Sequence, residues 1–152
     1  MGLWARGAHA ADPRLLVVEP PGSHGGFLSA LRIQLIGLAE PERIVQPLAA
    51  TPSAQIEAGT ALARSQHALA SVWLDPPLNR PSGVVLLYVV GEREGRALVE
   101  VVRVPGERGP ALERTLALKV REVVTELLRS ASSVPSAPTA EQLQAPPPPP
   151  AA

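Results

Sequence analysis

This sequence contains no cysteine and very few aromatic residues, and both deficits exclude kinds of function. Without cysteine, the 152-residue chain forms no disulfide, offers no thiolate ligand to zinc and has no cysteine nucleophile. Its two Trp, one Tyr and one Phe are too few for a sheet face on which several bases stack. No apolar run approaches the roughly 18 residues of a transmembrane helix, so we expect no membrane span.

The sequence also has a formal net charge of zero. The 14 Lys and Arg residues balance the 14 Asp and Glu residues, so the chain has no basic field to gather nucleic acid or anionic lipid. Lysine itself is nearly absent, since Lys119 is the single one. The sequence therefore predicts neither nucleic acid nor a membrane as a partner, and it leaves another protein, of unknown identity, as the expected one.

Proline, in contrast, is abundant, and 7 of the 18 prolines lie in the last 21 residues. Residues 132–152 also contain one charged residue, Glu141, and only two large aliphatic residues. Such a segment cannot bury enough apolar surface to offset the cost of ordering its backbone. We predict a disordered tail or spacer here; the alternative is a polyproline II docking peptide formed around residues 146–150.

The amino-terminal residues 1–12 include Ala8, His9 and Ala10, a small-x-small pattern typical of a signal-peptidase site. A secretory signal also needs a positive start and an apolar run, and neither fits before Ala8. The first hypothesis is therefore a remnant of a longer signal peptide, which predicts a periplasmic or secreted protein. If the pattern is accidental, the expected location is the cytoplasm.

The body of the chain, residues 13–131, predicts one mixed α/β domain. Its hydrophobic periodicity switches between the strand and helix patterns in the order β-α-β-α-β-β-β-α. The predicted strands cover residues 14–19, 43–47, 68–75, 83–90 and 96–104, and the predicted helices cover residues 23–38, 51–66 and 110–130. The two strand–helix–strand units should give parallel neighbours, and the last three strands an antiparallel meander. We expect a mixed sheet with helices packed on it, folded as one compact domain.

Three expectations concern single residues in this body. Ser23 should cap the first helix, whose apolar face runs from Phe27 to Leu38, and Pro41 should end that helix region. Thr51 followed by Pro52 should start the second helix. Pro47 cannot donate to a ladder, so the end of its strand should lie at an edge or outside the sheet. Trp73 and Tyr88, on predicted strands, are expected in the core.

A resemblance of pattern covers residues 14–129. The strand at Leu15–Val18, the helix with Phe27 and Leu28, and an Ala-rich second helix ending at Arg64 precede the strand around Trp73. This order resembles the amino-terminal domain of the periplasmic TolB family and the related domain of lipoproteins that activate penicillin-binding proteins. The resemblance implies a non-enzymatic accessory module of the bacterial envelope that binds other proteins. A lipobox cysteine is absent, so it implies no lipid anchor.

One local string suggests a ligand site. The segment from Glu19 to Gly26 follows a strand and opens a helix, where backbone N–H groups and the helix dipole can hold an anion. The alternative function is therefore a small-ligand or anion binder, or an enzyme, built on this turn, with these candidate residues: Gly22, Ser23, His24, Gly25 and Gly26. The string matches neither a dinucleotide fingerprint nor a phosphate-binding loop with lysine, and it lacks the glycine of a nucleophile elbow. A plain turn is the other interpretation.

The remaining polar residues suggest little chemistry. Four arginines around the predicted hairpin and the following loop form a hypothetical protein-contact surface: Arg93, Arg96, Arg103 and Arg108. The histidines His9, His24 and His67 have no metal-ligand spacing, so we expect no metal and no cofactor. No catalytic residue is identified, and we expect a protein that is not an enzyme. The third hypothesis for the function is a cytoplasmic binding module.

Overall fold

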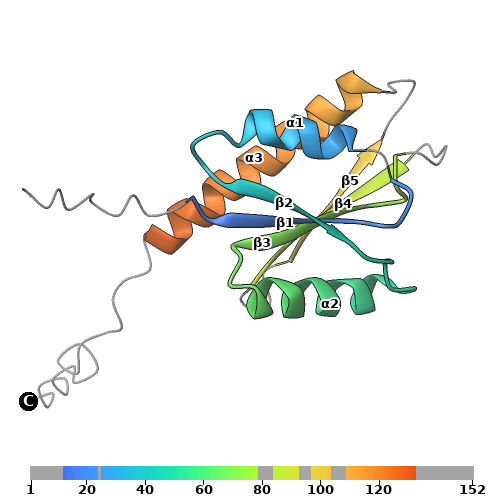
Figure 1. Cartoon of the computed structure of the whole chain (residues 1–152), viewed down its shortest axis with the longest axis horizontal. Helices are drawn as coiled ribbons and strands as arrows, with labels where there is room; N and C mark the ends of the chain where they lie inside the picture. Colours follow the sequence, from blue (N-terminus) through green and yellow to red (C-terminus); the bar gives the residue numbers. More distant parts are fainter. Residues whose placement is uncertain (1–11, 24, 79–83, 93–96, 104–108, 133–152) are drawn as a thin grey trace, which may run out of the picture.

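A five-stranded mixed sheet with three helices forms the body of the protein (Figure 1). The computed structural model describes residues 12–23, 25–78, 84–92, 97–103 and 109–132. The strands are β1 (Arg14–Glu19), β2 (Glu40–Val45), β3 (Ala70–Asp75), β4 (Val84–Gly91) and β5 (Ala97–Arg103), and the helices are α1 (Gly26–Gln34), α2 (Pro52–Ser65) and α3 (Pro110–Ser132). The predicted order of elements and the mixed α/β fold are confirmed.

The strand order β2-β1-β3-β4-β5 puts β1 between its two parallel neighbours. The other two pairings, β3 with β4 and β4 with β5, are antiparallel, as predicted for a meander. From β1 the chain crosses to β2 through α1, then returns past β1 to β3 through α2. Because these crossovers run in opposite directions, right-handed connections place the two helices on opposite faces of the sheet. Figure 1 shows α1 and α3 on one side and α2 on the other.

The two faces of the sheet have different cores. On the face of α1 and α3 the buried side chains are almost all aliphatic, and Phe27 is the single aromatic residue among them. On the face of α2, Trp73 stacks on Tyr88 with ring centroids 4.9 Å apart and planes 6° apart. Both rings are buried, which confirms that they belong to the core.

Helix α1 is shorter than predicted at both ends. It begins at Gly26 after Gly25, which makes no side-chain cap bond, so the predicted cap by Ser23 was wrong. The reason is that Ser23 closes a tight turn with Pro20 and lies too early in the chain to cap the helix. The helix ends at Gln34, before Gly37 with its positive φ of 76°, and not near Pro41.

Strand β2 lies at one edge of the sheet and starts earlier than predicted. Glu40 donates its N–H to Pro13 and Gln46 donates to Glu19, so alternate residues face β1. Pro41 therefore turns its missing donor outward, which an edge strand tolerates. The predicted strand 43–47 ended too late, because Pro47 lies two residues beyond β2, and the expectation that this end lies at an edge or outside the sheet is confirmed.

Helix α2 begins as predicted, because the Thr51 side chain accepts a hydrogen bond from the Ala54 N–H at 3.2 Å. Its buried face is made of Gln55, Gly59 and Ala63, while the larger Ile56 and Leu62 pack against the core from the side. Gly59 is required by the close approach of Trp73. A Cβ atom on Gly59 would lie 2.5 Å from Trp73 Cζ3, so only glycine lets the ring approach the helix.

Helix α3 covers the aliphatic face and runs to Ser132, slightly beyond its predicted end. No helix in the described ranges has the length and the apolar character needed to cross a membrane. The predicted leader remnant, apart from Asp12, and the predicted tail from residue 133 onward lie outside the described residues. Their assignment stays a prediction.

Candidate functional site: a pocket at the carboxyl ends of β1 and β3

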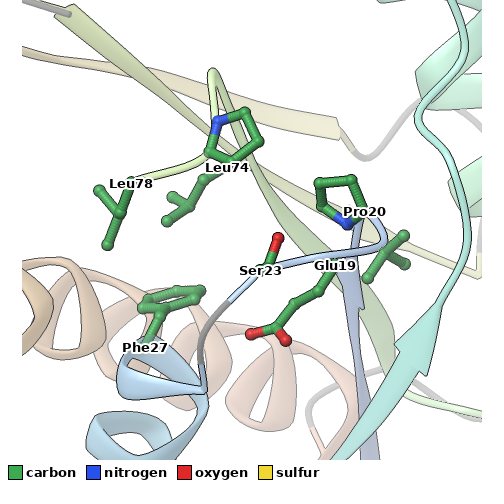
Figure 2. A pocket seen from close by; sticks show the side chains of 8 residues that line it. Glu19, Pro20, Ser23, Phe27, Leu74 and Leu78 are labelled. Atoms are coloured by element: carbon green, nitrogen blue, oxygen red, sulfur yellow. The ribbon is translucent and has the colours of Figure 1, made fainter. Parts of the chain in front are cut away.

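A small pocket opens where the parallel strands β1 and β3 end (Figure 2). Its volume is about 30 Å³, which is room for roughly two water molecules. The lining is mostly apolar and consists of Val18, Glu19, Pro20, Ser23, Phe27, Leu74, Pro77 and Leu78. In open α/β sheets, ligands bind beyond the carboxyl ends of the strands, near the point where connections leave to opposite faces. This pocket lies at that position.

The turn after β1 places Ser23 in the pocket. Ser23 donates its N–H to the Pro20 carbonyl at 3.2 Å, which closes a four-residue turn with Pro21 and Gly22 at its centre. Gly22 has a φ of 87°, as the third position of a type II turn requires, and proline suits the second position. The local sequence therefore determines where the Ser23 side chain lies.

The Ser23 hydroxyl is the unusual group of the pocket. Its Oγ is buried and has no hydrogen-bond partner among the described residues. A buried hydroxyl in that condition costs about 1–3 kcal/mol relative to one that is hydrogen-bonded. Figure 2 shows Ser23 with Glu19 and Pro20 on one side of the space, and Phe27, Leu74 and Leu78 on the other. The hydroxyl therefore offers a donor and an acceptor to whatever enters.

The second polar group of the pocket is the carboxylate of Glu19, whose side chain is only 8% exposed. Arg43, on the neighbouring strand β2, places Nε 2.8 Å from Glu19 Oε2. The same guanidinium donates from Nη2 to the Ser23 carbonyl at 3.0 Å. Arg43 thus compensates the buried charge and holds the turn that carries Ser23.

A second carboxylate lies at the start of α1. The Glu113 side chain, from α3, lies so close to Gly26 that a Cβ atom there would be 2.2 Å from Glu113 Oε1. Helix α1 has no acidic residue in its own first turn. Glu113 therefore supplies negative charge at the positive end of the α1 dipole, a favourable position for an anion.

The opposite face carries a polar network with different properties. Buried Gln55, in α2, accepts from Trp73 Nε1 at 2.9 Å and donates from Nε2 to the Ala49 carbonyl at 2.9 Å and to Asp75 Oδ2 at 3.1 Å. Burial raises the pKa of Tyr88 above its usual value of 10, and the nearby Asp75 carboxylate raises it further. The cavity beside Gln55 is about 20 Å³, and the Gln55 amide that lines it is already hydrogen-bonded.

Of the five residues predicted for a ligand site, four are described, and among these four only Ser23 lines the pocket. A Cβ atom on Gly22 or Gly25 would meet nothing within 4 Å, and Gly26 faces Glu113. His24 lies outside the described residues. The assignment of these residues to a ligand stays a prediction.

Most of the predicted arginine surface lies outside the described residues. Arg93, Arg96 and Arg108 lie outside the described residues, and Arg103 is described only by its backbone position at the end of β5. Within the described ranges, no group of three histidine or acidic residues is placed to hold a metal ion.

Sequence reasoning missed most of the pocket. Glu19 and Phe27 were visible as the end of a strand and the start of a helix, flanking the same turn. Leu74 and Leu78 come from β3 and the segment after it, about 50 residues away, and only the parallel pairing of β1 with β3 brings them to the turn. Arg43 reaches the site through the pairing of β1 with β2.

Comparison with known proteins gives a likeness of fold. No family model and no curated protein sequence matches this chain. A solved structure titled competence or damage-inducible protein, from Enterobacter asburiae, matches with 13% identity and a TM-score of 0.48, covering 76% of this chain and 87% of that one. A competence-damaged protein (CinA) superfamily structure from Enterobacter cloacae matches with 14% identity and a TM-score of 0.47, covering 76% and 82%.

These matches correct two predictions. The solved structures are described as competence-damaged proteins, and not as TolB or penicillin-binding-protein activators, so the predicted resemblance was wrong. The expectation of an accessory module of the bacterial envelope, which that resemblance implied, was wrong with it. The wrong resemblance has a physical source. The residues on which it rested follow strand and helix periodicities that many α/β domains share. The likeness to the solved structures likewise concerns the arrangement of helices and strands alone.

Proposed function

We propose that this protein binds a small molecule in the pocket between the carboxyl ends of β1 and β3. The observation that carries the proposal is the buried Ser23 Oγ, which faces an apolar pocket and has no partner among the described residues. Buried polar atoms are nearly always hydrogen-bonded, so an exception calls for an explanation, and a bound ligand group supplies one here. An apolar cavity with a few convergent polar groups is the usual form of a ligand site.

The architecture around the pocket supports the proposal. The type II turn and the Arg43 contacts fix the backbone of Ser23, so the hydroxyl is held in place before a ligand arrives. Phe27 and Leu74 are buried core residues on separate elements, and they give the pocket rigid walls. A pocket of about 30 Å³ admits the end of a ligand, while the remainder of the ligand lies at the open mouth.

We further propose binding without catalysis. The titratable group that lines the pocket is Glu19, and its ion pair with Arg43 opposes its use as a general base. The partner, and the location of the protein in the cell, stay predictions from the sequence.

A fragment screen by amide chemical-shift mapping on the isotope-labelled full chain tests the proposal. Fragments should shift the amide signals of Val18, Ser23, Phe27 and Leu78. Ser23→Ala should weaken the same fragments about 2- to 10-fold, the value of one hydrogen bond. Ser29→Ala is the matched control, because that serine is exposed on α1 and bonds only the Gly25 carbonyl. Shifts confined to other surfaces, or equal affinity in the Ser23 variant, would contradict the proposal.

A further inference from the structure

We infer that the ligand enters this pocket with an uncharged hydrogen-bonding group, such as an alcohol hydroxyl on a compact aliphatic body, and that Glu19 excludes anions. The inference rests on the proposed function, since it names the ligand class of the same pocket. It also differs from the anion site that the glycine-rich turn suggested.

The nearest charge is the Glu19 carboxylate, which lines the pocket with its side chain only 8% exposed. Repulsion between like charges is weak in water but several times stronger in a poorly solvated site. A carboxylate or phosphate that entered the pocket would lie beside this carboxylate, whereas Arg43, which pairs with it, does not line the pocket. An anionic ligand therefore loses affinity here relative to a neutral one of the same shape.

The groups that might have attracted an anion are already engaged. Arg43 uses Nε on Glu19 and Nη2 on the Ser23 carbonyl, so two of its three nitrogens already serve contacts within the fold. The positive end of helix α1 has the Glu113 carboxylate against Gly26. An incoming anion would have to displace one of these two carboxylates from its partner.

A cation fits less well than a neutral group for a different reason. An ammonium group must lose its hydration among Phe27, Leu74 and Leu78, and it would compete with Arg43 for Glu19. A hydroxyl group carries no such cost. It can accept from or donate to Ser23 Oγ, a buried atom of the pocket with no hydrogen-bond partner among the described residues.

Three compounds with one carbon skeleton test this inference: isopentanol, isovalerate and isopentylamine. Each is titrated into the labelled full chain, and binding is followed by the amide shifts of Ser23 and Leu78. We expect millimolar binding of the alcohol, because small ligands are limited in affinity per atom, and binding of isovalerate weaker by about tenfold or more. Glu19→Gln should reduce that difference, whereas Glu42→Gln, at an exposed ion pair, should leave it unchanged.

The outcomes separate the two proposals. Isovalerate or the amine binding at Ser23 as tightly as the alcohol would overturn the inference on ligand charge and support the pocket as a binding site. Binding of none of the three, together with a fragment screen that finds no ligand at Ser23, would overturn the proposed function itself. The wild-type comparison decides the inference even if Glu19→Gln fails to fold.

Discussion

Gln55 and Ser23 are two polar residues at the same end of the sheet, on opposite faces, and their surroundings differ. The buried Gln55 amide on the α2 face makes three hydrogen bonds, to Trp73, Asp75 and the Ala49 carbonyl. The buried Ser23 hydroxyl on the α1 face has no partner among the described residues. A satisfied polar network rigidifies a core, whereas an unsatisfied group costs free energy and persists where something else uses it.

We therefore assign different roles to the two faces of the sheet, stability to the α2 face and ligand binding to the α1 face. The α2 face is held by aromatic stacking and a closed polar network, which serve stability. The α1 face has an aliphatic core and, at its carboxyl end, the pocket with Ser23 and Glu19. Mutations on the α2 face should therefore damage folding, and mutations of Ser23 should damage binding.

The largest effect is expected from Gly59→Ala on the α2 face. The new Cβ would lie 2.5 Å from Trp73 Cζ3, and the ring is held by Tyr88 and Gln55, so it cannot move aside cheaply. We expect a loss of about 2–3 kcal/mol in the free energy of unfolding, measured by denaturant titration. Gly25→Ala, before α1, is the matched control, because a Cβ atom there meets nothing within 4 Å. Equal losses in the two variants would refute the close packing of Trp73 on α2.

A smaller loss is expected from Gln55→Leu. The Trp73 Nε1–H and the Asp75 carboxylate both lose their partner, and the indole is buried, so the cost should be about 1–3 kcal/mol. The comparison variant is Gln66→Leu, whose amide oxygen accepts only from Arg14 at the end of α2. A thermal melt in which Gln55→Leu is as stable as Gln66→Leu would show that the network contributes nothing.

The pH dependence of the α2 face depends on Tyr88. Burial first, and Asp75 second, raise the pKa of this phenol in the folded protein, while in the unfolded chain it stays near 10. The unfolded state therefore loses its proton first, and stability should fall as the pH rises above about 10. Tyr88 is the single tyrosine, so phenolate absorbance in the near ultraviolet reports it alone. A folded-state midpoint at or below that of the unfolded chain would refute the assignment, and Tyr88→Phe should lack the alkaline loss.

The sequence predicted the elements well and the pocket poorly, for physical reasons. Strand β1 has its predicted bounds, and Thr51 caps α2 as predicted, because hydrophobic periodicity and capping are local signals. The end of α1 and the position of Pro41 depend on which residues of β2 form hydrogen bonds with β1. No local sequence pattern predicts that pairing. Ser23 was identified beside its turn, but Leu74, Leu78 and Arg43 reach it only through strand pairing.

The most direct test of the account is the free energy of unfolding of Ser23→Ala in the absence of ligand, measured beside Gln55→Leu. Removing a buried hydroxyl that lacks a partner should leave stability within about 0.5 kcal/mol of the wild type or raise it slightly, while the Gln55 variant loses about 1–3 kcal/mol. A stability cost for Ser23→Ala as large as that for Gln55→Leu would mean that the hydroxyl supports the fold. The pocket would then have no hydroxyl held for a ligand, and the central claim would be contradicted.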